Sequence, residues 1–272
     1  MEYETRSGTE VPAIGLGTWQ MDTYTAYESV ATALDLGYRH IDTAQAYGNE
    51  FGVGRAIAEA EVDREDVFLT TKVLPTHRSV DAIVTSVEES VERLGVDAVD
   101  LLLIHWPNPL ADLETVMGGL NTAIDRGLAR HIGVSNFGKD RLDRAREYSD
   151  APIFTNQVLF HCWWPQRDLL QYCQANDILL TAYSPLANGA AIGDPLLSEI
   201  GERYGKSSAQ TELRWVTQHA NVVTIPMSTS RGHLRQNLDI FDFSLSRDEH
   251  DRITRPSYYR TGLSMLRGQL GL

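Results

Sequence analysis

The sequence predicts a (β/α)8 barrel, the TIM-barrel architecture in which eight parallel strands alternate with eight helices. Three observations lead to this prediction. The chain has 272 residues, close to the ~250 residues typical of such barrels. Short apolar runs alternate with longer amphipathic stretches eight times along the chain. The short runs are almost continuously apolar, which is the pattern of parallel strands covered by helices.

The elements are expected in a regular order. An N-terminal β-hairpin comes first, with strands at 3–6 and 10–14 that meet at a turn on Ser7 and Gly8. The barrel strands are expected at 14–19, 38–44, 67–73, 98–106, 129–136, 152–158, 178–184 and 221–227. The helices are expected at 25–37, 50–60, 79–95, 113–127, 139–149, 166–177, 195–220 and 231–238. A short C-terminal tail follows, and the absence of a linker predicts a single domain over residues 1–272.

The helical stretches show the expected periodicity and end signals. In the stretch 79–95, one face holds apolar side chains and the other side holds glutamates. Asp81, which Ser79 precedes, is expected to cap the start of this helix. The apolar positions are Ile83, Val87, Val91 and Leu94. The glycines expected as left-handed caps after three of the helices are Gly37, Gly95 and Gly127.

The charge of the chain argues against some classes of partner. The formal net charge is −13, and lysine occurs only at Lys72, Lys139 and Lys206. Phosphate backbones are bound by clustered cations, so no nucleic acid is expected as a partner. A surface rich in carboxylates and poor in lysine resembles that of proteins from salt-loving organisms. A GC-rich genome would produce the same exchange of lysine for arginine.

Other features favour a cytoplasmic protein. No run approaches the ~20 apolar residues of a membrane span, and the N-terminus lacks the pattern of a signal peptide. Cys162 and Cys173 have neither disulfide-framework nor metal-ligand spacing, so one surface thiol and one buried thiol are expected. His161 is expected to be structural, and no metal site is expected. No long exposed apolar patch can be read from the chain, so a monomer without a membrane partner is expected.

Polar side chains gather at the carboxyl ends of the predicted strands, where barrels of this kind form their active sites. A charged side chain at the end of an apolar strand is costly to bury unless it is paired or used. Any one of these residues could be an ordinary hydrogen-bonded strand end, but seven together predict a shared site. They are Asp42, Lys72, His105, Asn136, Gln157, Tyr183 and Ser184.

Four residues near these ends can form a proton donor of adjustable acidity. The phenol of Tyr47 has an ordinary pKa of ~10, and a neighbouring Lys72 ammonium is expected to lower that pKa toward neutrality. Asp42 would pair with Lys72 and keep it charged. His105 would donate a hydrogen bond that orients a substrate oxygen beside Tyr47. Such a group suits the protonation of an oxyanion as it develops.

A proton donor for a carbonyl oxygen needs a reductant, and further residues indicate a nicotinamide cofactor. The amides of Asn136 and Gln157 can bind a carboxamide, and the ring of Tyr183 can stack on a flat heterocycle. No G-x-G-x-x-G motif follows a strand, so a Rossmann-type site is not expected. The segment 225–237 runs from a loop into the start of a helix, where backbone N–H groups can receive phosphate.

These motifs resemble those of the aldo-keto reductase superfamily over almost the whole chain. HIDTAQAYGNE is similar to F-D-T-A-x-x-Y-x-N-E, and LIHWP is similar to the histidine motif of the fourth strand. IGVSNF and TNQV match G-V-S-N-F and the N-Q of the sixth strand. AYSPLANG resembles S-P-L-x-x-G, and IPMSTSRGHLRQN resembles I-P-K-S-x-x-x-x-R-x-x-E-N. The short tail and loops are most similar to the prokaryotic 2,5-diketo-D-gluconate reductase-like branch.

The resemblance implies a barrel that binds extended NADPH or NADH and reversibly reduces aldehydes or ketones to alcohols. It implies Tyr47 as the general acid, supported by Asp42 and Lys72, with His105 orienting the carbonyl. The cofactor-binding residues expected on this basis are Thr18, Trp19, Asp42, Ser135, Asn136, Gln157, Tyr183, Ser184, Leu186, Ile225, Ser228, Thr229, Ser230, His233 and Asn237.

Two positions depart from the family motif at the adenosine end of the cofactor. Met227 stands where the family has lysine and His233 where it has arginine, and both family cations normally face the 2′-phosphate. Methionine offers no charge, and histidine side chains are mostly neutral near pH 7. Arg231 and Arg235 lie nearby, although Arg235 is two residues beyond His233 and so faces another side of the helix. We expect NADH to be used well, with the preference for NADPH weakened or reversed.

The substrate is expected to be a small-molecule carbonyl compound, because aromatic walls with a few polar groups suit small or planar ligands. The residues expected to contact it are Trp19, Tyr47, His105 and Trp106. Further candidates for the pocket wall are Trp163, Trp164, Tyr258 and Tyr259, whereas Trp215 is expected in the core. The alternative to an enzyme is a non-catalytic nicotinamide-nucleotide-sensing or structural barrel protein. The proton-donor group favours catalysis, since a binding module has no need of it.

Overall fold

The eight predicted barrel strands form one parallel sheet. The computed structural model describes residues 2–270. Each strand pairs in parallel with the next one in chain order, from β3 to β10. The strands are β3 (Leu16–Gly17), β4 (His40–Asp42), β5 (Phe68–Val73), β6 (Val99–Ile104), β7 (Ala129–Ser135), β8 (Ile153–Leu159), β9 (Leu179–Tyr183) and β10 (Val222–Thr224).

Backbone hydrogen bonds between the first and last of these strands close the sheet into a barrel. The N–H of Thr224 donates to the carbonyl of Ala13 at 2.9 Å, and the N–H of Gly15 donates to the carbonyl of Thr224 at 2.7 Å. A Cβ at Gly17 would lie 2.7 Å from the carbonyl oxygen of Ile225, so the two strands approach this closely only with glycine. The predicted (β/α)8 barrel is therefore confirmed.

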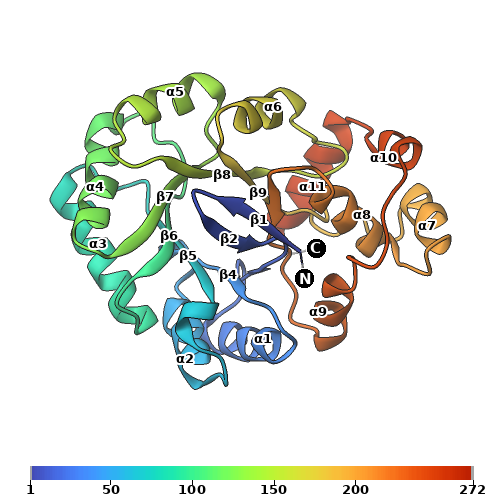
Figure 1. Cartoon of the computed structure of the whole chain (residues 1–272), viewed down its shortest axis with the longest axis horizontal. Coiled ribbons are helices and arrows are strands. Elements are labelled where there is room, and N and C mark those ends of the chain that lie inside the picture. Colours follow the sequence, from blue (N-terminus) through green and yellow to red (C-terminus); the bar gives the residue numbers. More distant parts are fainter. Residues whose placement is uncertain (1, 271–272) are drawn as a thin grey trace.

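The N-terminal hairpin covers one end of the barrel, where Figure 1 shows it across the centre of the ring of strands. Strands β1 (Tyr3–Arg6) and β2 (Thr9–Pro12) pair antiparallel, as predicted. Ser7 and Gly8 have φ of 49° and 79°, which is the left-handed pair that a two-residue hairpin turn requires. Val11 of β2 belongs to a buried apolar cluster inside the barrel. Its other members are Phe68, Leu101, Leu103, Phe154, Leu179 and Val223.

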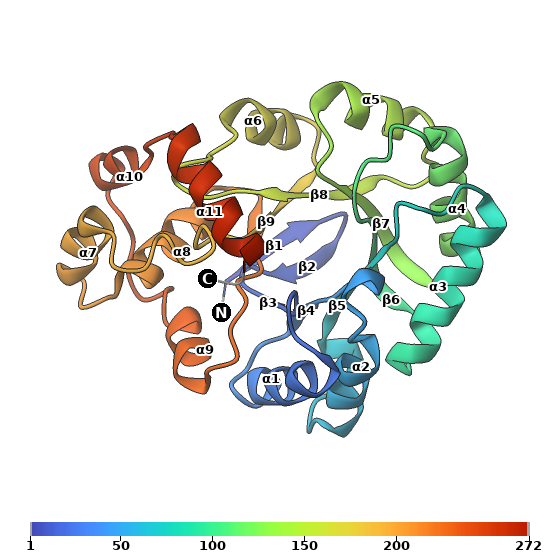
Figure 2. The same cartoon turned by 180° about the vertical axis from the view of Figure 1, so that it is seen from behind.

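Helices surround the barrel and cover the outer side of the sheet (Figures 1 and 2). The α-helices of the described residues are α1 (Thr23–Asp35), α2 (Glu50–Glu59), α3 (Val80–Leu94), α4 (Leu113–Asp125), α5 (Lys139–Glu147), α6 (Arg167–Ala175), α7 (Pro195–Glu202), α8 (Ser208–Thr217), α9 (Arg231–Leu238), α10 (Arg247–Ile253) and α11 (Tyr258–Leu270). Two short 3₁₀ helices, η1 (Gln45–Tyr47) and η2 (Arg64–Asp66), join strands to helices. The apolar face predicted for α3 is buried at Ile83, Val87, Val91 and Leu94.

Three details of the elements differ from the sequence predictions. The chain does not end in a short tail, because α10 and α11 follow the barrel, and Figure 2 shows α11 beside the barrel end opposite the hairpin. The stretch 195–220 holds two helices, separated at Gly205, whose φ is 69°. Ser79 rather than Asp81 caps α3, because Ser79 has extended backbone and its hydroxyl accepts from the N–H of Ala82.

Both cysteines are buried, so the expectation of one surface thiol is wrong. Cys173 lies on the inner face of the amphipathic helix α6, and Cys162 lies directly after β8. Burial raises the pKa of the Cys173 thiol to about 12, since a thiolate would lose its hydration there. Neither thiol is placed for chemistry at the surface.

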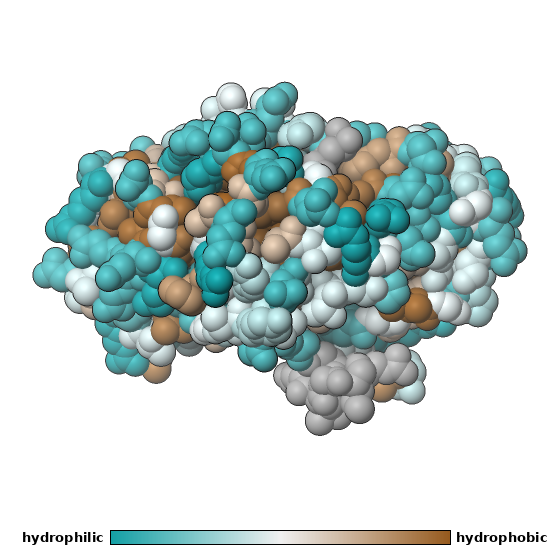
Figure 3. All heavy atoms as spheres, turned by 90° about the horizontal axis from the view of Figure 1, so that it is seen from below, coloured by the Kyte–Doolittle hydropathy of each residue, from teal (hydrophilic) through white to brown (hydrophobic). Residues whose placement is uncertain are grey.

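On the face that Figure 3 shows, hydrophobic residues appear between hydrophilic ones. The formal net charge of −13 reflects 37 acidic residues against 24 lysines and arginines. Among residues 2–270, no helix has both the length and the apolar character needed to cross a membrane.

Candidate active site

A cavity of about 630 Å³ opens at the carboxyl ends of the barrel strands. It collects most of the strand-end residues that the sequence singled out, because neighbouring strands place them side by side. Gly17 of β3 is in register with Asp42 of β4, and Ser135 of β7 is in register with Gln157 of β8. The predicted residues that line the cavity are Trp19, Asp42, Tyr47, His105, Trp106, Ser135, Asn136, Gln157, Tyr183, Ser184, Leu186 and Ile225.

Lys72 lies fully buried beneath this cavity and bonds to the groups around it. Its Nζ lies 2.5 Å from Oδ1 of Asp42 and donates to the carbonyl of Thr43 at 2.9 Å and to the hydroxyl of Tyr47 at 3.2 Å. The second oxygen of Asp42 accepts from Nε2 of Gln157 at 2.7 Å. A buried ion pair is tolerated when such additional bonds satisfy it. The expected association of Asp42, Tyr47 and Lys72 is therefore present.

The pKa of Lys72 lies above its ordinary value. Burial alone would lower the pKa, but attraction to the Asp42 carboxylate, with further contributions from Tyr47, outweighs burial. Lys72 is therefore a permanent cation at neutral pH.

The pKa of Tyr47 lies above its ordinary value, so the predicted shift toward neutrality is wrong in direction. Burial is the largest cause, because a phenolate would lose its hydration. Lys72 acts in the expected sense and lowers the pKa, but the nearby Asp42 carboxylate opposes it. Tyr47 is consequently a protonated phenol at neutral pH, with a cation within hydrogen-bonding distance of its oxygen.

His105 faces Tyr47 across the same end of the cavity. Their rings meet edge to face, with centroids 5.4 Å apart. Burial, with the positive charge of Lys72 acting in the same direction, lowers the pKa of His105 to about 3. The imidazole is therefore neutral and carries one N–H donor at physiological pH.

Polar side chains at the ends of β7, β8 and β9 also line the cavity. Nδ2 of Asn136 donates to Oγ of Ser135 at 3.0 Å, and Oδ1 of Asn136 accepts from the hydroxyl of Tyr183 at 3.0 Å. Ser135 in turn donates to the carbonyl of Gln157 at 2.8 Å. Asn136 has φ of 61°, a left-handed conformation that asparagine tolerates better than most residues. The amide side chains are therefore held in fixed orientations.

Some predicted residues do not line the cavity. Thr18 is buried next to it and donates its hydroxyl to the carbonyl of Asp42 at 3.1 Å. The rest belong to the loop after β10 and to α9, beyond the cavity wall: Ser228, Thr229, Ser230, His233 and Asn237. Their predicted contacts with a cofactor stay predictions. Ser230 caps α9, where its hydroxyl accepts from the N–H of His233.

The aromatic candidates divide into two groups. Trp19 and Trp106 line the cavity, as predicted. Trp163, Trp164, Tyr258 and Tyr259 do not, because Trp163 is buried and the ring of Trp164 packs edge to face on Tyr258. Trp215 is fully buried in the core, as predicted.

Sequence reasoning missed several residues of the cavity wall. Asn188 and Gly189 belong to the motif AYSPLANG and Met227 belongs to IPMSTSRGHLRQN, and their place in those motifs was the available signal. Met265 comes from α11, a helix that was not predicted, so no signal pointed to it. The full set of additional lining residues is Gly17, Gln20, Leu159, Pro185, Asn188, Gly189, Ile192, Pro226, Met227 and Met265.

His161 and its surroundings lie outside the cavity lining. Both ring nitrogens of this buried histidine lack a hydrogen-bond partner, and burial lowers its pKa to about 4. Within residues 2–270 there is no group of three or more His, Cys, Asp or Glu side chains arranged to hold a metal ion.

A parallel barrel whose strand-end cavity holds a phenol against a buried lysine–carboxylate pair places this chain among barrel-fold oxidoreductases. The chain belongs to the aldo-keto reductase family: the model of the Aldo/keto reductase family matches residues 13–256. The predicted enzyme class, an oxidoreductase of this family that uses a nicotinamide cofactor on carbonyl compounds, is confirmed.

Individual relatives cover nearly the whole chain. Glyoxal reductase of Bacillus subtilis (strain 168) is 41% identical and covers 91% of this chain and 89% of its own length. The crystal structure of a putative 2,5-diketo-D-gluconic acid reductase B has a TM-score of 0.91 at 42% identity, over 93% of this chain and 90% of that one. An aldo-keto reductase crystallised with NADPH has a TM-score of 0.89 at 30% identity, over 95% of this chain and 89% of that one.

Proposed function

We propose that this protein reduces small aldehydes and ketones to alcohols, with Tyr47 as the group that protonates the carbonyl oxygen. The observation that carries this proposal is the position of the Tyr47 hydroxyl, which faces the cavity and lies 3.2 Å from the buried ammonium of Lys72. A site that only binds a nucleotide has no use for a phenol next to a buried cation.

The acid step follows from the charges around Tyr47. Its raised pKa keeps the proton on the phenol until a carbonyl oxygen gains negative charge nearby. As the proton leaves, the oxygen of Tyr47 becomes negative, and the Lys72 ammonium stabilises this phenolate more strongly than it stabilised the neutral phenol. Asp42 keeps Lys72 charged and in place. In the reverse direction the phenolate would accept the proton from an alcohol.

His105 is proposed to orient the carbonyl. With a pKa of about 3 it stays neutral across the physiological range, so its N–H donates a hydrogen bond without competing for the proton of Tyr47. Its ring lies edge to face against Tyr47, so one oxygen atom between them could receive hydrogen bonds from both residues. Two donors to one oxygen stabilise the developing charge better than one.

The side of the cavity facing Tyr47 fits a nicotinamide carboxamide. Each amide side chain has two N–H donors and two lone pairs on its oxygen. Asn136 uses one donor on Ser135 and one lone pair on Tyr183, and Gln157 uses one donor on Asp42. A donor and an acceptor therefore stay available on each amide. When bound there, the cofactor supplies the hydride for the carbonyl carbon.

We propose that NADH is used well and that NADPH has no strong advantage. Met227, which lines the far end of the cavity, is uncharged, and His233 projects from the exposed first turn of α9. Arg231 is engaged at 2.6 Å by Asp35 of α1. A 2′-phosphate would find few unpaired cations at this end, although it needs charge-assisted partners to favour binding.

The walls around Tyr47 favour small or planar carbonyl compounds. Trp19 and Trp106 stand beside Tyr47 and His105 in the lining, and Leu159 adds an apolar surface. The names of the relatives, glyoxal reductase and 2,5-diketo-D-gluconic acid reductase, point to small aldehydes and keto sugars as the first compounds to test.

The Tyr47→Phe variant tests the proposal, because it removes one oxygen and leaves the ring in place. General acid catalysis contributes ~10²–10⁴-fold, so carbonyl reduction should fall by that factor. Binding of NADH, measured by quenching of protein fluorescence, should stay close to that of the unmodified chain. Turnover that survives in Tyr47→Phe would contradict the proposal. An unmodified chain that binds the cofactor but reduces no compound of a broad panel would favour a nucleotide sensor.

A further inference from the structure

Tyr47 does not stand on a strand. It is the last residue of η1 (Gln45–Tyr47), a single turn held by the bond from its N–H to the carbonyl of Ala44 at 3.0 Å. Gly48 follows with φ of 66°. Lys72, by contrast, lies within the hydrogen-bonded strand β5. The distance between the two side chains therefore depends on what holds η1 against β5.

Gln45, the first residue of η1, makes that connection. Its Nε2 donates to the carbonyl of Ser86 at 2.9 Å and to Oγ of Ser90 at 2.9 Å, both on α3. Its Oε1 accepts from the N–H of Leu74 at 2.9 Å. Leu74 directly follows β5, two residues after Lys72. One amide thus ties the turn that carries Tyr47 to the strand that carries Lys72, with α3 as the support.

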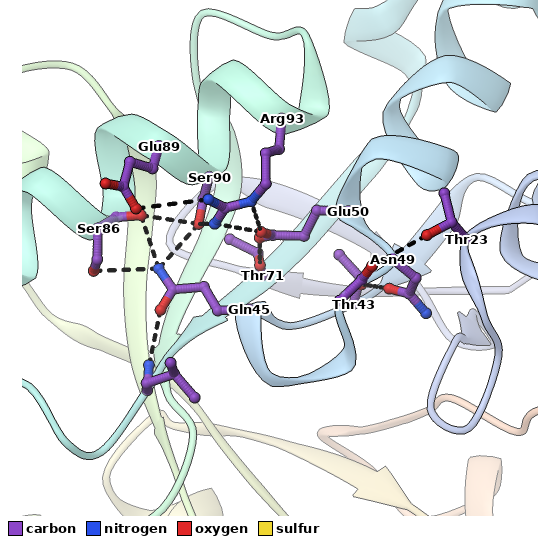
Figure 4. A network of polar contacts seen from close by, with 12 residues as sticks. Thr23, Thr43, Gln45, Asn49, Glu50, Thr71, Ser86, Glu89, Ser90 and Arg93 are labelled. Carbon is purple, nitrogen blue, oxygen red and sulfur yellow. Dashed lines mark hydrogen bonds and ion pairs between the residues drawn. The ribbon is translucent and has the colours of Figure 1, made fainter.

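A second set of bonds ties the residues after Tyr47 to the same strand and helix (Figure 4). Oε1 of buried Glu50 accepts from the hydroxyl of Thr71 at 2.6 Å, and Thr71 precedes Lys72 in β5. The other oxygen of Glu50 accepts from Nε of Arg93 at 2.8 Å. Arg93 also donates to Ser90 at 3.1 Å, so both sets meet at one hydroxyl of α3.

We propose that Gln45 is a positioning residue for the proton transfer, which sets the separation between the Tyr47 hydroxyl and the Lys72 ammonium. This inference rests on the proposed role of Tyr47. Without the Gln45 amide, the N–H of Leu74 loses its acceptor and η1 loses the hydrogen bonds of Gln45 to Ser86 and Ser90 of α3. The Tyr47 oxygen can then move away from Lys72, and a cation stabilises a phenolate less as the distance between them grows.

The Gln45→Ala variant tests this inference through a split between kcat and KM. A misplacement of ~1 Å can cost up to ~10²-fold in rate, so kcat for carbonyl reduction should fall about tenfold to 100-fold. KM and the Kd for NADH should stay close to the unmodified values, since Gln45 does not line the cavity. Alcohol oxidation needs the Tyr47 phenolate, and a more distant Lys72 raises the pKa of Tyr47. The pH at which the oxidation rate reaches its plateau should therefore move upward. The milder Ser90→Ala variant should show the same changes at smaller size.

The Gln218→Ala variant is a matched control. Gln218, at the end of α8, also donates and accepts through one amide, with the carbonyl and the N–H of Leu245 as partners at 2.8 and 2.9 Å. Its loss should lower the thermal midpoint and leave kcat and the pH profile unchanged. If Gln45→Ala behaves in the same way while Tyr47→Phe is inactive, the positioning role is wrong. If Tyr47→Phe stays active, the proposed function fails first, and the role of Gln45 fails with it.

Discussion

The two ends of the cavity are built in opposite ways. At the carbonyl end, the side chains of Lys72 and Asp42 are 0% and 2% exposed, and further bonds satisfy both charges. At the end proposed for the adenosine, Met227 of the cavity wall is exposed, and the ion pair of Arg231 with Asp35, just outside the wall, is more than half exposed. Electrostatic interactions are strong at the first end and screened at the second.

This difference separates two functions of one site. The proposed proton donor depends on groups that are buried, oriented and mutually bonded, so we expect a substitution there to disturb both stability and chemistry. In the proposed binding mode, recognition of the adenosine end would depend on exposed side chains of α9 and the loop before it, which can change without affecting the core. The departures at Met227 and His233 fall only in the second region. We therefore expect the chemistry and the choice of cofactor to respond independently to substitution.

The largest effect is expected from Lys72→Met at the carbonyl end. The variant leaves Asp42 buried without its cation, and breaking a buried pair costs ~3–5 kcal/mol of stability. It also removes the charge that stabilises the Tyr47 phenolate, so kcat should fall ~10²-fold or more even in the folded fraction. Steady-state kinetics and thermal unfolding measure the two effects.

Lys206→Met is the control for loss of a paired lysine. Lys206 is also mostly buried and contacts Asp239 and Asp242, each at 2.8 Å, but it lies outside the cavity lining. Its kcat should equal that of the unmodified chain. A Lys72→Met variant that keeps its full kcat would remove the distinction between the two ends.

An intermediate effect is expected from Met227→Lys combined with His233→Arg at the far end. Each new charge-assisted hydrogen bond to a 2′-phosphate should contribute ~1.5 kcal/mol, the lower end of the usual range for such bonds, because both positions are exposed. This free energy corresponds to ~10-fold in affinity. The Kd for NADPH should fall accordingly, whereas the Kd for NADH and kcat serve as internal controls and should not change. Equal gains for both cofactors would contradict the assignment of this end to the phosphate.

A smaller effect is expected from salt. Raising the ionic strength from 0.1 to 1 M shortens the screening length from ~10 to ~3 Å. In the Met227→Lys, His233→Arg variant, the Kd for NADPH should rise several-fold over this range. The kcat at saturating NADH should change little, because the Lys72–Asp42 pair is shielded from solvent. A kcat that follows the same salt curve as the NADPH Kd would show that the two ends are coupled.

Much of the barrel could be predicted from the sequence, because its strands are apolar runs with clear ends. Strand ends fix where side chains meet, so the grouping of Asp42, Lys72 and His105 followed from the strand assignment alone. Helix α10 could not be predicted in this way, since the residues of RDEHDRI are mostly charged and show no apolar period. Met265 in the cavity wall was missed for a different reason, because its position depends on how α11 packs against the barrel.

The pKa of Tyr47 shows a second limit. Its neighbour Lys72 could be inferred from motifs, but the balance of burial against that charge depends on three-dimensional packing. The contacts of Gln45 with Ser86 and Ser90 likewise join segments about 40 residues apart that no periodicity relates. The sequence thus predicted which groups interact, but not whether burial or the charge of Lys72 determines the direction of the Tyr47 pKa shift.

The most direct test compares NADH and NADPH with the unmodified protein on a panel of small aldehydes and ketones. We expect turnover with NADH, similar kcat values for the two cofactors, and kcat/KM for NADH at least equal to that for NADPH. A preference of about 100-fold for NADPH, equivalent to ~2.7 kcal/mol, would contradict the difference drawn between the two ends of the cavity. Binding of both cofactors without turnover on any compound would contradict the proton-donor role of Tyr47.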